Sequence, residues 1–249
     1  ILPDSYLANS AYASEDRGAK RPEFGNIYKL YYTRCRRSNV MDFDDLLLYT
    51  NILFKIDPST LAKYQERFDY YLVDEYQDTN FAQYLIVKRL SEKNRRLFVV
   101  GDDAQSIYSF RGAEIQNILN FKNDYPDYKL FKLEQNYRST QNIVDAANSL
   151  IKKNKDQIKK NVFSENEVGD KVQINKAVSD NMEGVMVAKK IIELHDAGAK
   201  YSDCAVLYRT NAQSRILEES MRNLGIPYKV FGGMSFYQRK EIKDALAYV

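Results

Sequence analysis

Several residue types that mark particular protein classes are scarce in this chain of 249 residues. Tryptophan is absent, and the single histidine, His195, has no cysteine or second histidine near it in the sequence to complete a metal site. The two cysteines, Cys35 and Cys204, lie far apart, and Cys204 begins an apolar run. We therefore expect no disulfide and a reducing compartment.

Long apolar runs and a strong net charge are also lacking. No run approaches the roughly 20 apolar residues that span a bilayer, and the first residues, ILPDSYLANS, lack the basic start and apolar stretch of a signal peptide. Hydrophobic residues at 44% and charged residues at 29% are ordinary for a soluble globular protein, so we expect no membrane partner. The net charge of +3 is too small to identify a nucleic-acid partner.

Short apolar runs alternate with helical patterns over most of the chain. Residues 1 to about 40 are mostly helical in pattern, notably 24–37, and Asp42 can cap the next helix. Strands are expected at 68–73, 96–100, 128–133, 172–178, 204–208 and 228–233. Because helical patterns separate these runs, the sequence predicts an α/β fold of parallel sheets with flanking helices, with a boundary near Gln135. The Lys-rich segment 151–161 is expected to be a solvated helix end and loop.

Polar clusters follow the first three predicted strands. They read DEYQD, GDDAQS and EQNYRS, at 74–78, 101–106 and 134–139. Open α/β sheets bind ligands at the carboxyl ends of their strands. One such cluster could consist of caps and turns, but three on neighbouring strands predict a shared site.

The first cluster begins with two adjacent acids, Asp74 and Glu75. Neighbouring side chains on a strand point to opposite faces, so the two acids cannot have the same role as long as they belong to the strand. At the strand end, one acid can hold hydrated Mg²⁺ while the other polarises a water for phosphoryl transfer. Capping of the next helix is the alternative interpretation, and it accounts for Asp78 or Asn80 but not for the adjacent pair.

The other two clusters add groups suited to phosphates and bases. Gln105 could hydrogen-bond a terminal phosphate, and Arg138 can fork onto phosphate oxygens. Tyr137, beside Arg138, could stack on a flat base. Taken alone, a glutamine in a loop or an arginine before a helix more often lies on the surface than binds a ligand.

The segment SIYSFRGA, at 106–113, places two aromatic residues and an arginine within four positions: Tyr108, Phe110 and Arg111. Such a loop is a plausible platform for unstacked nucleic-acid bases, because stacking tolerates any sequence. The alternative interpretation is an aromatic pair buried under the loop.

Four motifs together resemble the UvrD/PcrA/Rep helicases of superfamily one. They are DEYQDTN, GDDAQSIYSFRGA, LEQNYRST and YRTNAQSR, in the family's order, and the resemblance covers essentially all of the chain. It implies two partial RecA-like P-loop NTPase domains, at 41–136 and 137–249, preceded at 1–40 by the end of a helical inserted domain. It also implies an ATP-driven motor that moves 3′ to 5′ on single-stranded DNA in repair or replication, in the bacterial cytoplasm.

The resemblance further implies which residues meet ATP and Mg²⁺. Asp74 would coordinate the metal, and Glu75, at the same metal, would activate the hydrolytic water. Gln105 would sense the γ-phosphate, Arg138 would contact it from the second domain, and Tyr137 would stack on adenine. Contacts with single-stranded DNA or duplex junctions would come from Phe43, Tyr108, Phe110, Arg111, Arg209 and Asn211.

One expected motif is missing from the chain. The phosphate-binding pattern GxxxxGK[ST] does not occur, so the amide cradle and lysine for the phosphates are lacking. The chain also starts without Met and stops at DALAYV inside an apparent helix, and we expect an internal fragment that cannot hydrolyse ATP alone. The alternatives are a nucleotide-independent DNA-binding or interaction module, or part of a helicase–nuclease subunit.

Overall fold

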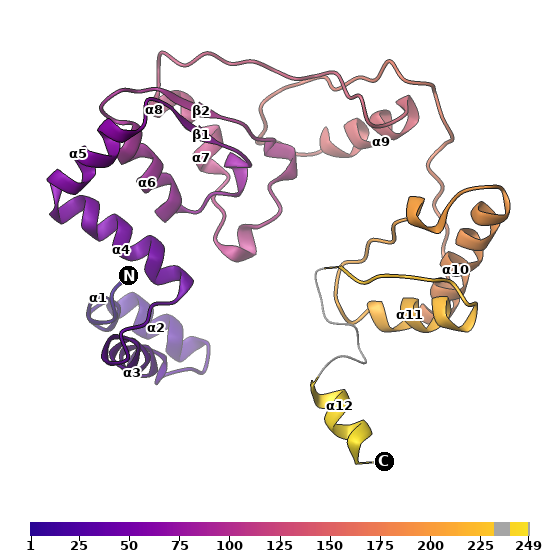
Figure 1. Cartoon of the computed structure of the whole chain (residues 1–249), viewed down its shortest axis with the longest axis horizontal. Coiled ribbons are helices and arrows are strands. Elements are labelled where there is room, and N and C mark those ends of the chain that lie inside the picture. Colours follow the sequence, from indigo (N-terminus) through magenta and orange to yellow (C-terminus); the bar gives the residue numbers. More distant parts are fainter. Residues whose placement is uncertain (232–239, 249) are drawn as a thin grey trace. The chain divides into compact units, whose positions relative to one another are not determined.

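Two units, Ile1–Asp170 and Lys171–Val249, make up the computed structural model, which describes residues 1–231 and 240–248 (Figure 1). The first unit begins with three helices, α1 (Pro3–Leu7), α2 (Ser10–Gly18) and α3 (Phe24–Arg37). α1 packs on α3 at Gly25, where an added Cβ would lie 2.6 Å from Leu7 Cδ2. The helical pattern at 24–37 is therefore confirmed, and a glycine permits the close helix crossing.

Two further helices lead to the sheet: α4 (Phe43–Ile56) and α5 (Pro58–Arg67). Asp42 Oδ1 accepts a hydrogen bond from the backbone N–H of Asp45 at 2.8 Å, and the backbone N–H of Asp42 donates to Asp45 Oδ2 at 3.4 Å, which confirms the predicted cap. Asp57 caps α5 by accepting hydrogen bonds from the backbone N–H groups of Ser59 and Thr60, with Pro58 at the first helical position. α4 packs against both α5 and α6 (Phe81–Ser91), so these helices support the connection between the strands.

The sheet of this unit consists of two parallel strands, β1 (Tyr71–Val73) and β2 (Leu97–Val99), joined through α6. Tyr71 pairs with Leu97 and Val73 with Val99 in register. Asn80 begins α6 with a reciprocal capping pair to Gln83. The first two predicted strands are thus confirmed, although both are shorter than the apolar runs that predicted them.

Short turns and helices follow the strands. They are the 3₁₀ turns η1 (Tyr76–Asp78), η2 (Asp103–Gln105) and η3 (Ser109–Arg111), and the helices α7 (Gln116–Leu119), α8 (Phe121–Asp124) and α9 (Gln141–Ile151). Tyr76 is 1% exposed and packs edge-on against Phe121, with 5.9 Å between ring centroids. Burial of this aromatic ring fixes η1 directly behind the end of β1.

The third predicted strand, at 128–133, is wrong, because this segment is extended but unpaired. Leu133 is 89% exposed, and the nearest pairing is an isolated parallel bridge between Gln135 and Phe163. A strand is stable only where a neighbour satisfies its backbone N–H and C=O groups. Sequence pattern identified a β-prone segment here but could not supply its partner.

The second unit contains α10 (Asp180–Asp196), the 3₁₀ turn η4 (Tyr201–Asp203), α11 (Ser214–Asn223) and α12 (Lys240–Ala247). α10 and α11 pack around four buried residues, Ala188, Ile191, Met221 and Ile226. The strands expected at 172–178 and 204–208 are wrong, and residues 228–231 also form no strand. Residues 232 and 233, the end of the last expected strand, lie outside the described residues.

Candidate functional site

The loops that follow β1 and β2 leave the same edge of the sheet, because parallel strands point the same way. Hydrogen bonds join these loops where the strands end: Val100 N–H donates to Val73 O at 2.8 Å, and Tyr76 N–H donates to Val100 O at 2.9 Å. The polar clusters 74–78 and 101–106 are therefore neighbours, as the sequence predicts.

The two acids lie immediately beyond β1. Glu75 has a left-handed backbone with φ of 50°, a region that non-glycine residues seldom occupy, and its N–H donates to Asp74 Oδ1 at 2.9 Å. Both side chains are exposed. The turn thus projects two carboxylates beyond the strand, as a ligand site at a sheet edge requires.

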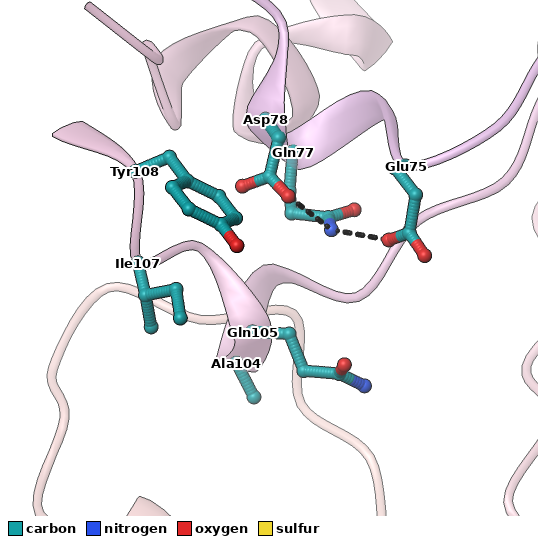
Figure 2. Close-up of a pocket in the computed structure, with 7 residues that line it drawn as sticks. All are labelled: Glu75, Gln77, Asp78, Ala104, Gln105, Ile107 and Tyr108. Atoms are coloured by element: carbon teal, nitrogen blue, oxygen red, sulfur yellow. Dashed lines mark hydrogen bonds between the residues drawn. The ribbon is translucent and has the colours of Figure 1, made fainter. Parts of the chain in front are cut away.

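Gln77 lies beneath these acids and is 1% exposed. Its Nε2 donates to Glu75 Oε2 at 2.7 Å and, more weakly, to Asp78 Oδ2 at 3.3 Å, as the dashed lines in Figure 2 show. Its Oε1 accepts from the backbone N–H of Asp102 at 3.0 Å. One buried amide therefore connects the acid turn with the loop after β2.

A pocket of about 550 Å³ opens between the two loops (Figure 2). It is lined by Glu75, Gln77, Asp78, Ala104, Gln105, Ile107 and Tyr108. The structure thus brings together three predicted site residues: Glu75 and Gln105 from two polar clusters, and Tyr108 from the aromatic segment. Asp74 is adjacent in the chain but is not among the lining residues.

Gln105 is tied to its own loop, because its Nε2 donates to Asp102 Oδ2 at 2.7 Å. Asp102 also pairs with Lys160, which reaches Asp103 Oδ1 at 3.0 Å as well. Burial raises the pKa of Asp102, but hydrogen bonds from Lys160 and Gln105 outweigh it and hold that pKa below its ordinary value. Burial likewise opposes the charge of Lys160, yet the two carboxylates raise its pKa.

The aromatic loop lies next to this pocket. Arg111 stands over the rings of Tyr108 and Phe110, with Cζ to centroid distances of 5.3 and 5.4 Å. Phe110 is 71% and Tyr108 38% exposed, so the alternative of a buried aromatic pair is wrong. Tyr108, Arg111 and Asp78 line a second pocket of about 250 Å³. Tyr108 and Asp78 thus border both pockets.

Tyr137 and Arg138 are exposed and line neither of these two pockets. The Tyr137 hydroxyl donates to Gln135 Oε1 at 2.8 Å, and the backbone N–H of Arg138 donates to Asn136 Oδ1 at 2.9 Å. The structure therefore presents both side chains on a turn before α9 without bringing them to Glu75.

The remaining predicted DNA contacts are also exposed. Phe43 is the first residue of α4 and 89% exposed. In the second unit, Arg209 and Asn211 precede α11, and Gln213 Oε1 accepts from the backbone N–H of Arg209 at 3.0 Å. These three positions remain predictions.

Two residues of the site escaped sequence reasoning. Gln77 stands inside the recognised DEYQD cluster, and only its burial reveals its position between the loops. Lys160 belongs to the Lys-rich segment that was expected to be solvated, yet its side chain is only 23% exposed and pairs with Asp102 and Asp103. A lone lysine among many carries no sequence signal for such a contact.

The acid turn suits a hard cation that keeps most of its water. Mg²⁺ is commonly bound through one or two carboxylates together with phosphate oxygens, and Asp74 and Glu75 supply that number. Asp78 Oδ1 is in addition buried without a hydrogen-bond partner in the described structure. Within 1–231 and 240–248, no group of three or more His, Cys, Asp or Glu side chains forms an all-protein metal cage. The donor set therefore fits magnesium together with a phosphate ligand.

Comparison with known proteins identifies the family of the chain. Residues 2–126 match the UvrD/REP helicase N-terminal domain, and residues 131–249 match the UvrD-like helicase C-terminal domain. The chain belongs to the UvrD-like helicase family. UvrD-like helicase domains imply a RecA-like P-loop fold, and the parallel β1–α6–β2 unit agrees with it.

Curated relatives of this UvrD-like chain are bacterial proteins named ATP-dependent DNA helicase PcrA. The one from Staphylococcus epidermidis is 48% identical over 98% of this chain and 34% of its own length. Those from Leuconostoc citreum and Bacillus subtilis are 47% and 49% identical, over 96% and 90% of this chain and 32% and 30% of their own lengths. The UvrD-like chain thus spans about a third of these relatives. None of its described helices has the length and apolar character needed to cross a membrane.

Proposed function

We propose that this chain contributes to an ATP-dependent DNA helicase that moves 3′ to 5′ on single-stranded DNA in the bacterial cytoplasm. The observation that carries the proposal is one pocket lined by Glu75 and Gln105, from the loops after two parallel strands, in a UvrD-like chain. Residues 41–136 and 137–249 would belong to two RecA-like domains, and residues 1–40 to a helical insertion. The PcrA relatives, ATP-dependent DNA helicases by name, support this proposal.

In this proposal Asp74, with Glu75 beside it, holds Mg²⁺, which when bound neutralises charge on the phosphates. The Glu75 carboxylate takes a proton from the attacking water, whose oxygen forms a bond to the γ-phosphorus. The bond from that phosphorus to the β–γ bridging oxygen breaks, and its electron pair leaves with ADP. The Gln105 amide contacts the γ-phosphate through its second N–H, while the first donates to Asp102 Oδ2 at 2.7 Å.

The second domain supplies the other nucleotide contacts in the proposal. Arg138 reaches the γ-phosphate and Tyr137 stacks on adenine, and both are exposed for such a docking. DNA contacts come from Tyr108, Phe110 and Arg111, with Phe43, Arg209 and Asn211 at further positions on the track. Gln105 and Tyr108 line one pocket, so a single short loop joins the phosphate sensor to the first DNA contact.

The test is ATP turnover stimulated by single-stranded DNA, measured on this chain and on an intact helicase that carries it behind a phosphate loop. Because GxxxxGK[ST] is absent from the chain, we expect DNA-stimulated turnover from the intact helicase only. Turnover by the chain alone, at the rate of an intact motor, would contradict the division of labour proposed here. DNA binding without any stimulated turnover in either protein would instead favour the nucleotide-independent binding module.

A further inference from the structure

Gln77 is the residue that connects the proposed base with the second loop. We propose that Gln77 is a positioning residue for ATP hydrolysis, which fixes the Glu75 carboxylate and couples its orientation to the loop after β2. The inference rests on the proposed role of Glu75 in activating water. Its basis is a single side chain, 1% exposed, that hydrogen-bonds both loops.

The orientation of the Gln77 amide follows from its partners. The backbone N–H of Asp102 can only donate, so the amide atom 3.0 Å away must be the carbonyl oxygen Oε1. The amide nitrogen Nε2 then faces Glu75 Oε2 at 2.7 Å, where an ionised carboxylate can only accept. A flipped amide would lose both hydrogen bonds, and a buried amide does not tolerate such a loss. The two contacts therefore fix one orientation.

Space around the amide is closed on the side of the second loop. A Cβ added at Gly101 would lie 2.7 Å from Gln77 Oε1, so only glycine at this position leaves room for the side chain. The backbone oxygen of Gln77 also accepts from Ser106 Oγ at 3.3 Å, one residue beyond Gln105. Both loops thus hold Gln77 at more than one point.

As a consequence, Gln77 holds one oxygen of the Glu75 carboxylate and leaves the other oxygen available to water. Oε2 is occupied by Gln77, and no side chain or backbone group of the described residues hydrogen-bonds Oε1. Glu75 has a left-handed backbone with φ of 50°, and the Gln77 amide holds its carboxylate from the turn η1. A movement of the loop that carries Gln105 is transmitted through Asp102 N–H and Gln77 to the base.

The kinetic test uses Gln77→Met and Gln77→Glu in an intact helicase that carries this chain. Met fills the same space without the hydrogen bonds, and Glu keeps an acceptor for Asp102 but places a second carboxylate against Glu75. We expect kcat to fall by about 10- to 100-fold in both, as when outer-shell partners are removed, with the KM for ATP changed less than about twofold. Gln65→Met is the matched control, because the Gln65 amide donates to Arg89 O at 2.7 Å, neither residue lines the pocket, and kcat should stay unchanged.

Gly101→Ala provides an independent variant, because it pushes on the Gln77 amide from the other loop and should lower kcat with the same unchanged KM. Loss of kcat in proportion to loss of thermal stability across all four variants, Gln65→Met included, would show a merely structural role. Wild-type kcat in Gln77→Met would overturn the inference directly. Absence of DNA-stimulated turnover in the wild-type helicase would instead remove the proposed function.

Hydrogen exchange of the Gln77 side-chain amide tests its burial and hydrogen bonding without an activity assay. In this chain labelled with ¹⁵N-glutamine, the side-chain amide protons of Gln77 should exchange with solvent at least about tenfold more slowly than those of exposed Gln213, since buried hydrogen-bonded groups are protected. Disappearance of the signal in Gln77→Met assigns it. Exchange as fast as that of Gln213 would overturn the inference even if the helicase hydrolyses ATP.

Discussion

Residues 71–117 and the second unit, 171–249, have similar sequence patterns and different structures. In both, short apolar runs alternate with helical patterns. In the first region two strands pair and their loops are joined by the amide of Gln77. In the second, helices α10 and α11 form a core, while the apolar runs around them stay unpaired.

The difference shows which elements a local sequence can complete by itself. A helix satisfies its backbone hydrogen bonds internally, so α10 and α11 need only an apolar face to bury. A strand needs a neighbour, and Ile174, Val178 and Leu207, which are 96%, 91% and 94% exposed, have none among the described residues. The site accordingly forms where two strands pair.

Substitution of Glu75 should give the largest difference in ATP turnover between a variant of the first region and a variant of the second unit. In an intact helicase, Glu75→Gln keeps the size of the side chain but removes the proton acceptor, so ATP turnover should fall by about 10²- to 10⁴-fold. Nucleotide affinity, followed with a fluorescent ATP analogue, should stay within about threefold. Glu193→Gln is the control in the second unit, because the Glu193 side chain is exposed and pairs with Lys190 at 2.6 Å. A Glu75→Gln enzyme with half the wild-type turnover would remove Glu75 from the mechanism.

A stability measurement tests whether the second unit rests on its helix pair alone. Met221 is 5% exposed in the core between α10 and α11. Met221→Ala should lower the free energy of unfolding by about 2–5 kcal/mol, because it leaves a cavity. Leu207→Ala removes a side chain that is 94% exposed and should change the free energy of unfolding by less than about 0.5 kcal/mol. Urea unfolding of each variant, monitored through the exchange of backbone amides in α10, measures both changes in the free energy of unfolding. An equal cost at Leu207 would show that residues 204–208 pack in a sheet.

Sequence reasoning was most successful where the signal is local. Asp42 and Asn80 were predicted as caps and are caps, because a capping side chain bonds backbone three residues away. The convergence of Glu75 and Gln105 followed from strand order alone. Burial of Gln77 and the pairing of Lys160 with Asp102 could not be predicted, because each depends on segments 25 or more residues apart. The predictions of strands at 128–133, 172–178 and 204–208 were wrong for the same reason, because a strand needs a partner from elsewhere in the chain.

A smaller effect, on DNA affinity, is expected in the aromatic loop, where Phe110→Ala can be compared with Tyr70→Ala as a matched control. Phe110→Ala should weaken binding of an oligothymidylate by about 1–3 kcal/mol, the contribution of one stacked base. Tyr70, just before β1, has its own arginine, with Arg96 Cζ 5.5 Å from the ring centroid, but lies at the opposite strand end. Tyr70→Ala should therefore leave the affinity unchanged in a fluorescence titration. Equal losses for the two variants would mean that exposed aromatics bind DNA without a specific platform.

The ion pair that joins Lys160 to the loop after β2 can be broken by one substitution. Lys160→Met leaves Asp103, whose side chain is 3% exposed, without its cation, and should destabilise this region by about 1–3 kcal/mol at pH 7. Exchange of the Ile158 amide, which donates to Asp103 Oδ2 at 3.0 Å, reports the local opening.

The pH dependence of this difference follows from the two shifted groups. The pKa of Asp102 is lowered in the folded chain, so its contribution is present above its unfolded pKa of about 4 and is lost as pH falls through the folded value. The pKa of Lys160 is raised, so its contribution is complete below its unfolded pKa of about 10.4 and is lost as pH rises through the folded value. The wild type and Lys160→Met should therefore differ in Ile158 exchange between about pH 5 and 9, and the difference should shrink as the pH falls through the lowered pKa of Asp102. A difference that persists undiminished as the pH falls through the lowered pKa of Asp102 would mean that Lys160 acts through packing of its aliphatic chain.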